Sequence, residues 1–125
     1  MTFLDTHVVV WLYAGETGRL SARGRQEIAT QPLFVSPIVV LELQYLFEIG
    51  RITVRPSDIL ATLAQDIGLT LCDDLLEAVV SAALGATWTR DPFDRLIVAH
   101  ATVRGAALLS KDGAILENCP TAIWD

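Results

Sequence analysis

The sequence predicts an α/β protein with a mainly parallel sheet of four to five strands, covered by helices on both faces. Short, nearly all apolar runs alternate with longer segments of helical periodicity. Strands that lack a polar face are typical of parallel sheets whose two faces are both buried. The chain has 125 residues, of which 52% are hydrophobic, and this length and composition suit one core. We therefore expect a single domain over residues 1–125.

Five short apolar runs are the predicted strands. Each run is rich in β-favouring residues and is too short for a helix. In order, they are Thr2–Asp5, Leu33–Ser36, Leu69–Cys72, Ala106–Ser110 and Thr121–Trp124. Helical patterns separate the first four runs, which favours parallel rather than hairpin connections between them.

Proline at the first turn and glycine just past the end mark most of the predicted helices. Proline has a backbone preset for a helix start, and glycine accepts the left-handed conformation that ends many helices. The predicted helices are Thr6–Ala14, Ser21–Thr30, Ile38–Ile49, Pro56–Ile67, Leu75–Leu84 and a last one that starts at Pro92 and ends at Gly105. Arg51–Arg55 is a connector, and Lys111–Glu117 is a turn or a short helix.

The sequence shows no sign of a signal peptide or a membrane span. Asp5 interrupts the N-terminal apolar residues, and no apolar run approaches the roughly 18 residues that a spanning helix needs. Cys72 and Cys119 lie far apart and form no Cys-x-x-Cys or Cys/His pattern, so we expect reduced, buried thiols and no zinc site. We expect a cytoplasmic protein that does not contact membranes.

The net charge of −6 argues at first against a nucleic-acid binder, since phosphate groups usually meet a basic surface. This objection weakens if some of the acids bind cations. If four of the 15 acidic side chains hold metal ions, the remainder nearly balance the 9 basic ones. An acidic pocket that carries divalent ions can bind phosphate that the bare pocket would repel.

The segment from Arg90 to Ala101 places two carboxylates at the start of a helix. Asp91 reads as the N-cap, Pro92 as the first helical residue and Asp94 as the third. Both acids stabilise a helix start through capping and the helix dipole, so capping alone explains them. A catalytic role for Asp94 requires other acids to converge on the same place.

Glu42 interrupts an apolar stripe of its predicted helix. Its neighbours one turn away in each direction are Ile38, Val39, Tyr45 and Leu46. A carboxylate buried among aliphatic side chains is costly unless it is neutralised, paired with a cation or bound to a metal. Glu42 is therefore either a metal ligand or the partner of an arginine such as Arg95.

Further acids follow the ends of predicted strands. Asp5 and Asp112 directly follow the first and fourth strands, and Asp73 follows the third. Each has an ordinary explanation, because Asp-Thr is a common helix cap and Asp-Gly a common turn. Ligands of open parallel sheets bind beyond the carboxyl ends of the strands. An α/β sheet can gather Asp5, Glu42, Asp94 and Asp112 at that one edge.

Four stretches carry a family resemblance, in the same order and over essentially the whole chain. They are Leu4-Asp5-Thr6-His7 with Trp11, Ser36-Pro37 followed by Leu41-Glu42-Leu43, Asp91-Pro92-Phe93-Asp94-Arg95-Leu96-Ile97, and Leu109-Ser110-Lys111-Asp112. Together they resemble the acidic motifs of the PIN domain, and more closely the VapC toxins of bacterial toxin-antitoxin pairs. The resemblance implies a three-layer α/β/α sandwich and an endoribonuclease that depends on Mg²⁺ or Mn²⁺. It also implies a homodimer that binds a VapB-like antitoxin protein.

By this resemblance Asp5, Glu42, Asp94 and Asp112 form the acidic tetrad, with Asp91 as an accessory residue. A set of oxygen ligands without His or Cys favours Mg²⁺ or Mn²⁺ over zinc, and one or two ions fit the number of acids. We expect Asp5, Glu42 and Asp94 to hold the first ion. Asp112, with Asp94 or Asp91, helps to hold a second ion or orients water. Hydrolysis would then leave a 5′-phosphate and a 3′-hydroxyl.

Several other residues are candidates for contact with the RNA substrate. The resemblance puts Thr6 beside the first acid and Ser110 near the last one. Arg90, Arg95 and Lys111 border the acids and would hold phosphates, or they balance nearby carboxylates. Three tryptophans, Trp11, Trp88 and Trp124, could stack on bases, although tryptophan is more common in a core. No nucleophilic side chain is required, and His100 reads as a packed histidine.

Two other functions compete with a nuclease. A phosphoryl-accepting receiver module has a similar size and acidic strand ends, and Asp73 and Lys111 would serve as its acceptor and lysine. A receiver, however, needs a second acid beside Asp5 and has no use for Glu42 on an apolar stripe. The second alternative is a PIN-like domain that only binds partners, against which the complete tetrad argues.

Overall fold

The structure, a computed structural model, describes residues 1–125 and contains one five-stranded parallel sheet in the order β3-β2-β1-β4-β5. The strands are β1 (Thr2–Leu4), β2 (Leu33–Val35), β3 (Thr70–Leu71), β4 (Ala107–Leu109) and β5 (Ala122–Ile123). The predicted parallel sheet is confirmed, and the strands are shorter than expected. Asp5 and Ser36 lie beyond the ends of β1 and β2, because each is the N-cap of the helix that follows.

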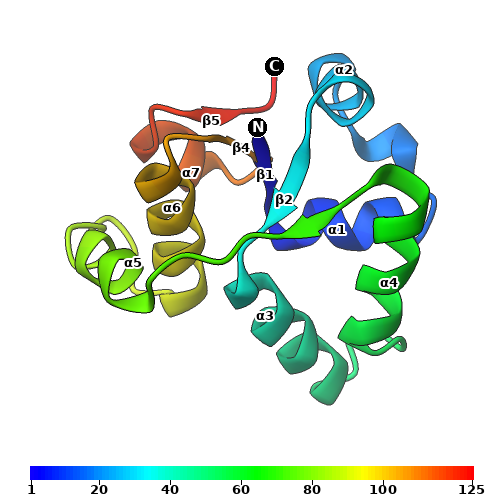
Figure 1. The fold of residues 1–125 in the computed structure, drawn as a ribbon, viewed down its shortest axis with the longest axis horizontal. Helices are drawn as coiled ribbons and strands as arrows, with labels where there is room; N and C mark the ends of the chain where they lie inside the picture. Colours follow the sequence, from blue (N-terminus) through cyan, green and yellow to red (C-terminus); the bar gives the residue numbers. More distant parts are fainter.

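Helices cover both faces of the sheet, which confirms the expected three layers. In Figure 1, α5, α6 and α7 lie to the left of the central strands, α1, α2 and α4 lie to the right, and α3 lies below. The helices are α1 (Thr6–Tyr13), α2 (Ala22–Thr30), α3 (Pro37–Glu48), α4 (Pro56–Ile67), α5 (Leu76–Ala83), α6 (Pro92–Arg104) and α7 (Gly113–Asn118), with a short 3₁₀ helix η1 (Thr17–Arg19) after α1. None of them combines the length and apolar character that a membrane span requires.

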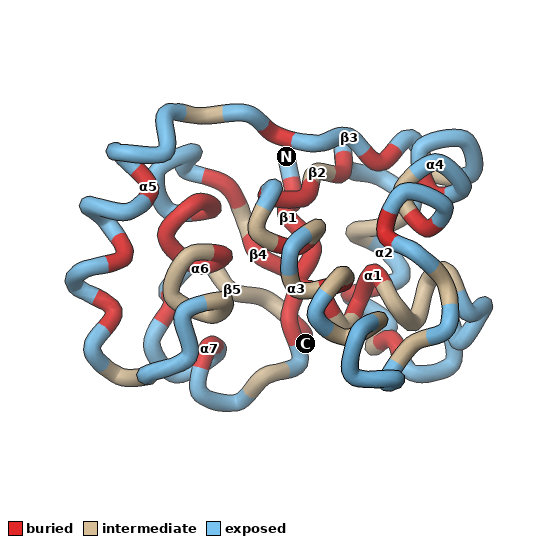
Figure 2. The backbone as a smooth tube through the Cα atoms, turned by 90° about the horizontal axis from the view of Figure 1, so that it is seen from below, coloured by how far each residue is buried: buried red, intermediate tan, exposed pale blue.

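The central strands are the most deeply buried part of the chain (Figure 2). Phe3 and Leu4 of β1 and Leu108 and Leu109 of β4 have no exposed surface. They belong to one core of 22 buried residues that also includes apolar side chains of α1, α3, α4 and α6. The sheet and the helices around it are therefore packed as one body, on which the loops at the strand ends are held.

The strand order creates a switch point between β1 and β4. From β1 the chain adds β2 and β3 on one side, and it then crosses to add β4 and β5 on the other side. Ligands of open α/β sheets bind in the crevice at such a point, outside the carboxyl ends of the strands. Asp5 follows β1 and Asp112 follows the end of β4, so both acids lie at this crevice.

A buried polar network joins α3, α6 and the segment after β3. His100 on α6 is 2% exposed, which confirms that it is a packed histidine. Its Nδ1 lies 2.7 Å from Ser36 Oγ, at the start of α3, and its Nε2 lies 2.9 Å from Asp74 Oδ2. Arg104 donates to the other Asp74 oxygen over 3.1 Å. The network fixes the helix that carries Glu42 against the helix that carries Asp94.

Candidate active site

Five acidic side chains line a cleft of about 560 Å³ at the carboxyl end of the sheet. They are Asp5, Glu42, Asp91, Asp94 and Asp112. The structure thus brings together all five residues that the sequence proposed as metal ligands, from four separate regions of the chain. Asp73, which also follows a strand, is exposed and does not line this cleft.

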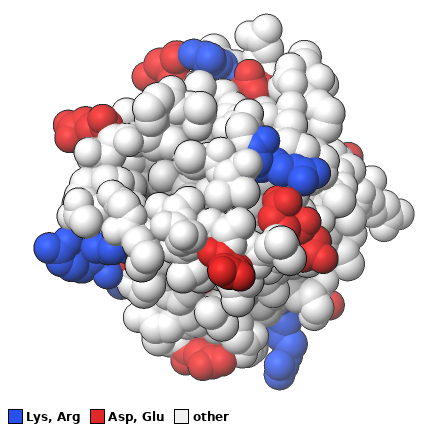
Figure 3. All heavy atoms as spheres, turned by 60° about the vertical axis from the view of Figure 1, so that its left-hand side comes forward, with Lys and Arg blue, Asp and Glu red and all other residues white.

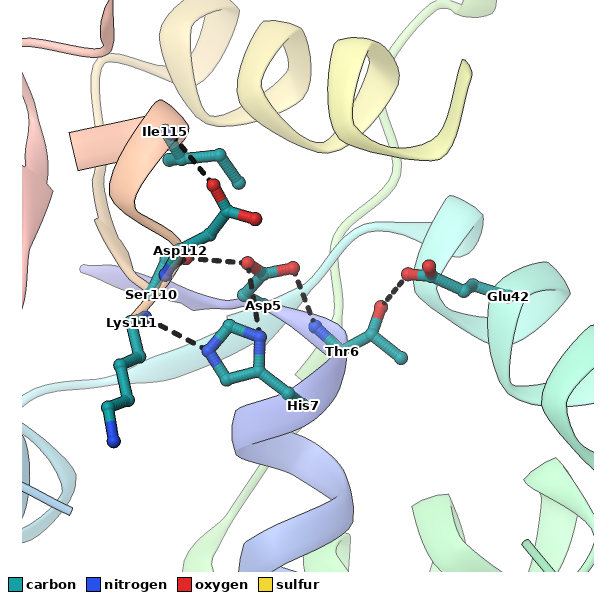
Figure 4. Close-up of polar contacts among 8 residues, drawn as sticks. All are labelled: Asp5, Thr6, His7, Glu42, Ser110, Lys111, Asp112 and Ile115. Carbon is teal, nitrogen blue, oxygen red and sulfur yellow. Dashed lines mark hydrogen bonds and ion pairs between the residues drawn. The ribbon is translucent and has the colours of Figure 1, made fainter. Parts of the chain in front are cut away.

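Asp5 is held rigidly at the floor of the cleft, where it is only 3% exposed. Its Oδ1 accepts a hydrogen bond of 2.8 Å from the backbone N–H of Thr6, as expected of a helix cap. Its Oδ2 accepts a hydrogen bond of 2.6 Å from the Ser110 hydroxyl (Figure 4). With both oxygens oriented by neighbours, Asp5 is suited to bind a cation without reorganising.

Ser110 connects the first and the last acid of the site. Besides donating to Asp5, its hydroxyl accepts a hydrogen bond of 3.1 Å from the backbone N–H of Asp112. Ser110 has no exposed surface, and the expected contact between its side chain and the substrate stays a prediction. The structure shows a residue that orients two carboxylates from beneath.

Asp112 and Asp91 each combine a position in the cleft with the capping of a helix. Asp112 Oδ1 accepts a hydrogen bond of 3.0 Å from the N–H of Ile115 and so caps α7. Asp91 Oδ1 accepts from the N–H groups of Phe93 and Asp94 over 2.8 and 3.3 Å, which confirms it as the N-cap of α6. The Oδ2 atoms of Asp91 and Asp112 take no part in these capping hydrogen bonds.

Glu42 is half-buried in the wall of the cleft and accepts a hydrogen bond from the Thr6 hydroxyl (Figure 4). Burial raises the pKa of Glu42 and the Thr6 hydrogen bond opposes this, while the charges of Asp5 and Asp91 raise it further. Arg95 does not pair with Glu42, because its Nε donates to the backbone oxygen of Thr89 over 2.9 Å. The ion pair considered as the alternative for Glu42 is therefore absent.

Asp94 experiences the strongest electrostatic conflict in the cleft. Burial, together with repulsion from the other four acids, raises the pKa of Asp94 from 3.8 to about 7. None of the ion pairs in the structure joins a lysine or arginine to these five carboxylates. A cluster of oxygen ligands that lacks a balancing cation fits a hard divalent ion such as Mg²⁺ or Mn²⁺.

His7, which the sequence placed one turn into an apolar helix and did not propose as a site residue, lines the cleft as well. Its Nδ1 lies 3.5 Å from Asp5 Oδ2, and its Nε2 accepts a hydrogen bond of 2.9 Å from the backbone N–H of Lys111. Burial lowers the pKa of His7. The neutral ring bridges the starts of the two acidic loops, and its position two residues after Asp5 was the one signal that pointed to it.

The basic residues near the site differ in their placement. Arg90 donates to the backbone oxygen of Thr87 over 2.9 Å, and Arg95 likewise donates to Thr89, so both guanidinium groups stabilise the loop before α6. Neither of them lines the cleft, and their contact with substrate stays a prediction. The arginines that do line the cleft are Arg19 and Arg51, which the sequence did not single out.

A second group of possible ligands lies outside the cleft. Ligand atoms of Cys72, Asp74 and His100 lie within 4.8 Å of one another. Both oxygens of Asp74 already accept hydrogen bonds, from His100 and from Arg104. The arginine supplies the positive charge that a metal ion would bring, so this group is a structural network.

Comparison with known proteins identifies the family. The sequence pattern of the PIN domain matches residues 2–119. The chain belongs to the PIN-domain family. The receiver module is therefore wrong as an alternative, in agreement with the position of Asp73 outside the cleft.

The PIN domain described here is similar to proteins of toxin-antitoxin pairs. It is 32% identical over 130 residues to Ribonuclease VapC22 of Mycobacterium tuberculosis, a match that covers 97% of this chain and 96% of that protein. Its fold matches a chain of VapBC2 from Rickettsia felis bound to a promoter DNA fragment, with a TM-score of 0.65, 18% identity and coverage of 99% and 98%. A toxin-antitoxin complex from Klebsiella pneumoniae gives a TM-score of 0.68 at 12% identity, with coverage of 98% and 96%. At these identities the two structures show a common fold.

Proposed function

We propose that this PIN domain is an Mg²⁺- or Mn²⁺-dependent endoribonuclease and the toxin of a toxin-antitoxin pair. The observation that carries the proposal is the cleft in which Asp94, with its pKa raised to about 7, faces four other carboxylates and no paired cation. The similarity to a ribonuclease over nearly the full length of both chains supports RNA as the substrate.

We propose that the acids of the cleft are shared between one or two metal ions. Asp5, Glu42 and Asp94 would hold the first divalent ion, and Asp112 with Asp94 or Asp91 would hold a second one or orient water. Ions bound there would supply the positive charge that eases deprotonation of water and stabilises the leaving 3′ oxygen. The products would be a 5′-phosphate and a 3′-hydroxyl.

The other residues of the site would prepare this arrangement and bind the RNA. The Thr6 hydroxyl orients Glu42, and the Ser110 hydroxyl orients Asp5. Arg51, whose side chain takes part in no ion pair in the structure, is available to a phosphate at the rim of the cleft. The side chains of the protein thus supply alignment, while the bound ions supply most of the charge.

A homodimer and a VapB-like antitoxin are the proposed protein partners. The fold neighbours include toxin-antitoxin complexes, which supports the antitoxin. Leu75, Leu76 and Leu84 around α5 are 80%, 64% and 70% exposed. The side of the molecule drawn in Figure 3 shows uncharged surface between separate acidic and basic side chains. The exposed leucines support a contact with a second copy. The expected location of the pair is the cytoplasm.

Cleavage assays with matched variants test the enzymatic proposal. Purified wild-type protein should cut single-stranded RNA when Mg²⁺ or Mn²⁺ is present and should stop when the ion is chelated. Asp5→Asn and Asp94→Asn should each abolish cleavage, because a neutral amide binds a divalent cation poorly. Asp66→Asn, which removes an exposed acid from the end of α4, is the matched control and should cleave normally.

Growth assays test the toxin and the alternative of a domain that only binds partners. Induction of this chain alone in a bacterium should halt growth, and induction of Asp94→Asn should not. Wild-type protein that forms a stable complex with an antitoxin but never cuts RNA would support the binding-only alternative instead.

A further inference from the structure

We infer that Trp11, with Arg19 and Lys111 beside its ring, forms a subsite that stacks one base of single-stranded RNA and binds the adjoining phosphate. The subsite rests on the proposed function, since the acids would hold the scissile phosphate while Trp11 receives a neighbouring nucleotide. Trp11 lines the same cleft as the acids, and it is one of four apolar side chains there.

The ring of Trp11 is held in a defined orientation at the cleft. Trp11 follows His7 by one helical turn, and the two ring centroids are 4.9 Å apart. The ring of Trp124 also contacts the Trp11 ring, in an edge-to-face arrangement with the two centroids 6.1 Å apart. Trp124 is only 9% exposed and so acts as a fixed support, whereas Trp11 is half-buried and faces the cleft. A preoriented aromatic ring loses little freedom when a base stacks on it.

Two cations flank this ring. The Arg19 guanidinium carbon lies 5.4 Å from the centre of the Trp11 ring, and the Lys111 ammonium lies 5.9 Å from it. Lys111 forms no ion pair, although Asp112 is its neighbour in the chain. Its side chain extends past His7 and away from the Asp112 carboxylate (Figure 4). The ammonium is therefore free to exchange its weak contact with the ring for a phosphate.

The charges of the cleft favour this position for the nucleotide. The centre of the cleft carries five acids, which would repel every phosphate except one bound through metal ions. A flanking nucleotide needs a positive contact outside this centre. Lys111 provides it without giving up an ion pair, whereas Arg19, whose Nε lies 2.9 Å from Glu16 Oε2, would have to share its charge between this exposed carboxylate and the phosphate. Aromatic stacking combined with basic side chains is the usual way in which proteins bind single strands without reading every base.

Fluorescence quenching offers a direct test, because the chain has three tryptophans and only Trp11 lines the cleft. The test uses full-length protein with Asp94→Asn, so that the RNA stays intact, and a short single-stranded oligoribonucleotide as the probe. We expect the RNA to quench the fluorescence, and we expect Trp11→Phe to remove most of the quenching. Trp88→Phe is the matched control, since Trp88 does not line the cleft, and it should keep the quenching.

Measurements of RNA affinity distinguish base stacking on Trp11 from a general electrostatic attraction between the protein and a polyanion. Trp11→Leu should weaken RNA binding about tenfold, the typical effect of losing one stacked base. An oligonucleotide of the same length without bases should bind weakly and cause little quenching. Lys111→Gln should lower the slope of log affinity against log salt by about 1, as loss of one phosphate contact requires. Arg23→Gln, on α2 outside the cleft, should leave the slope unchanged.

Equal quenching with Trp11→Phe, or equal binding of the strand without bases, would overturn the subsite. A melting curve for each variant shows whether it is folded, and Trp11→Phe retains an aromatic ring against His7 and Trp124. Binding is measured without cleavage, so the two proposals fail separately. Quenching at Trp11 by a wild-type protein that never cuts RNA would overturn the nuclease and leave the subsite.

Discussion

The Ser110 hydroxyl donates a hydrogen bond of 2.6 Å to Asp5 Oδ2 and thereby ties the end of β4 to the end of β1. The same hydroxyl receives the backbone N–H of Asp112. One buried oxygen therefore sets the distance between the first and the last acid of the cleft, at the switch point of the sheet.

Replacing this hydroxyl should weaken the metal site more than the fold. We expect Ser110→Ala to reduce Mn²⁺ affinity about 10- to 100-fold, the range found for residues that orient metal ligands. The free energy of unfolding should fall by about 1–3 kcal/mol, because the Asp112 N–H loses its partner. Calorimetric titration and urea denaturation measure the two effects. Ser81→Ala on the exposed side of α5 should change neither, and an unaltered Mn²⁺ affinity in Ser110→Ala would contradict the orienting role.

Asp94 should make the metal-free protein less stable as the pH rises. Its pKa is about 7 in the folded protein and 3.8 ordinarily, so ionisation is disfavoured by folding and stability is lost between these two values. Asp94→Asn removes the charge. Since Asp94 is partly open to solvent, we expect this variant to gain only about 1 kcal/mol at about pH 8, and nothing at about pH 4. Urea denaturation with a chelator measures this, with Asp66→Asn as control. A gain that is equal at both pH values would refute the electrostatic cause.

Divalent ions should reverse this instability in the wild-type protein. An ion present at about 100 times its dissociation constant should stabilise the fold by about 2.7 kcal/mol, and the melting temperature should rise accordingly. Lower pH should weaken the effect, because protons compete with the ion for Asp94. Thermal melts with and without Mn²⁺ should show no shift for Asp5→Asn. A full shift in that variant would mean that the ion binds elsewhere.

The buried network at His100 should be important for stability rather than for chemistry. His100→Phe removes the ring hydrogen bonds to Ser36 and Asp74, while Asp74 keeps its contact with Arg104, and we expect the free energy of unfolding to fall at neutral pH. The His100 hydrogen bond holds the pKa of Asp74 below its ordinary value. The stability from this contact is thus present above about pH 3.9 and is lost as the pH falls through the lower folded pKa. Denaturation at several pH values measures it, and Thr102→Ala on the same helix is the control.

The sheet and the helix starts could be predicted because their signals are local. Short apolar runs that alternate with helical segments predicted the parallel strands. Pro92 and Gly105 marked the start and the end of α6. The cap at Asp91 follows from the same few residues. The third strand was predicted too long, because β3 covers only Thr70 and Leu71. The Cys72 N–H still donates to the Val35 oxygen over 2.9 Å, and the chain then turns toward the network at Asp74.

The partners within the site were harder to predict because they depend on how distant elements face each other. Glu42 was chosen correctly as unusual, yet its actual neighbour is Thr6 and not Arg95. Residue type alone could not show that Ser110 is completely buried or that Arg51 enters the cleft. Ser110 and Arg51 both lie in segments that connect helices and strands. Their placement depends on how these connections pack against distant elements, which no local pattern determines.

All five acids of the cleft lie at the carboxyl end of the sheet or on the helices that start there. The turns at the opposite end, such as those at Gly68 and Gly105, therefore contribute no side chain to the cleft. This separation makes that end a natural attachment point. A dye, an affinity tag or a tether to a surface inserted at the Gly105 turn would leave the acids undisturbed, so single molecules of the protein could be followed while they engage RNA.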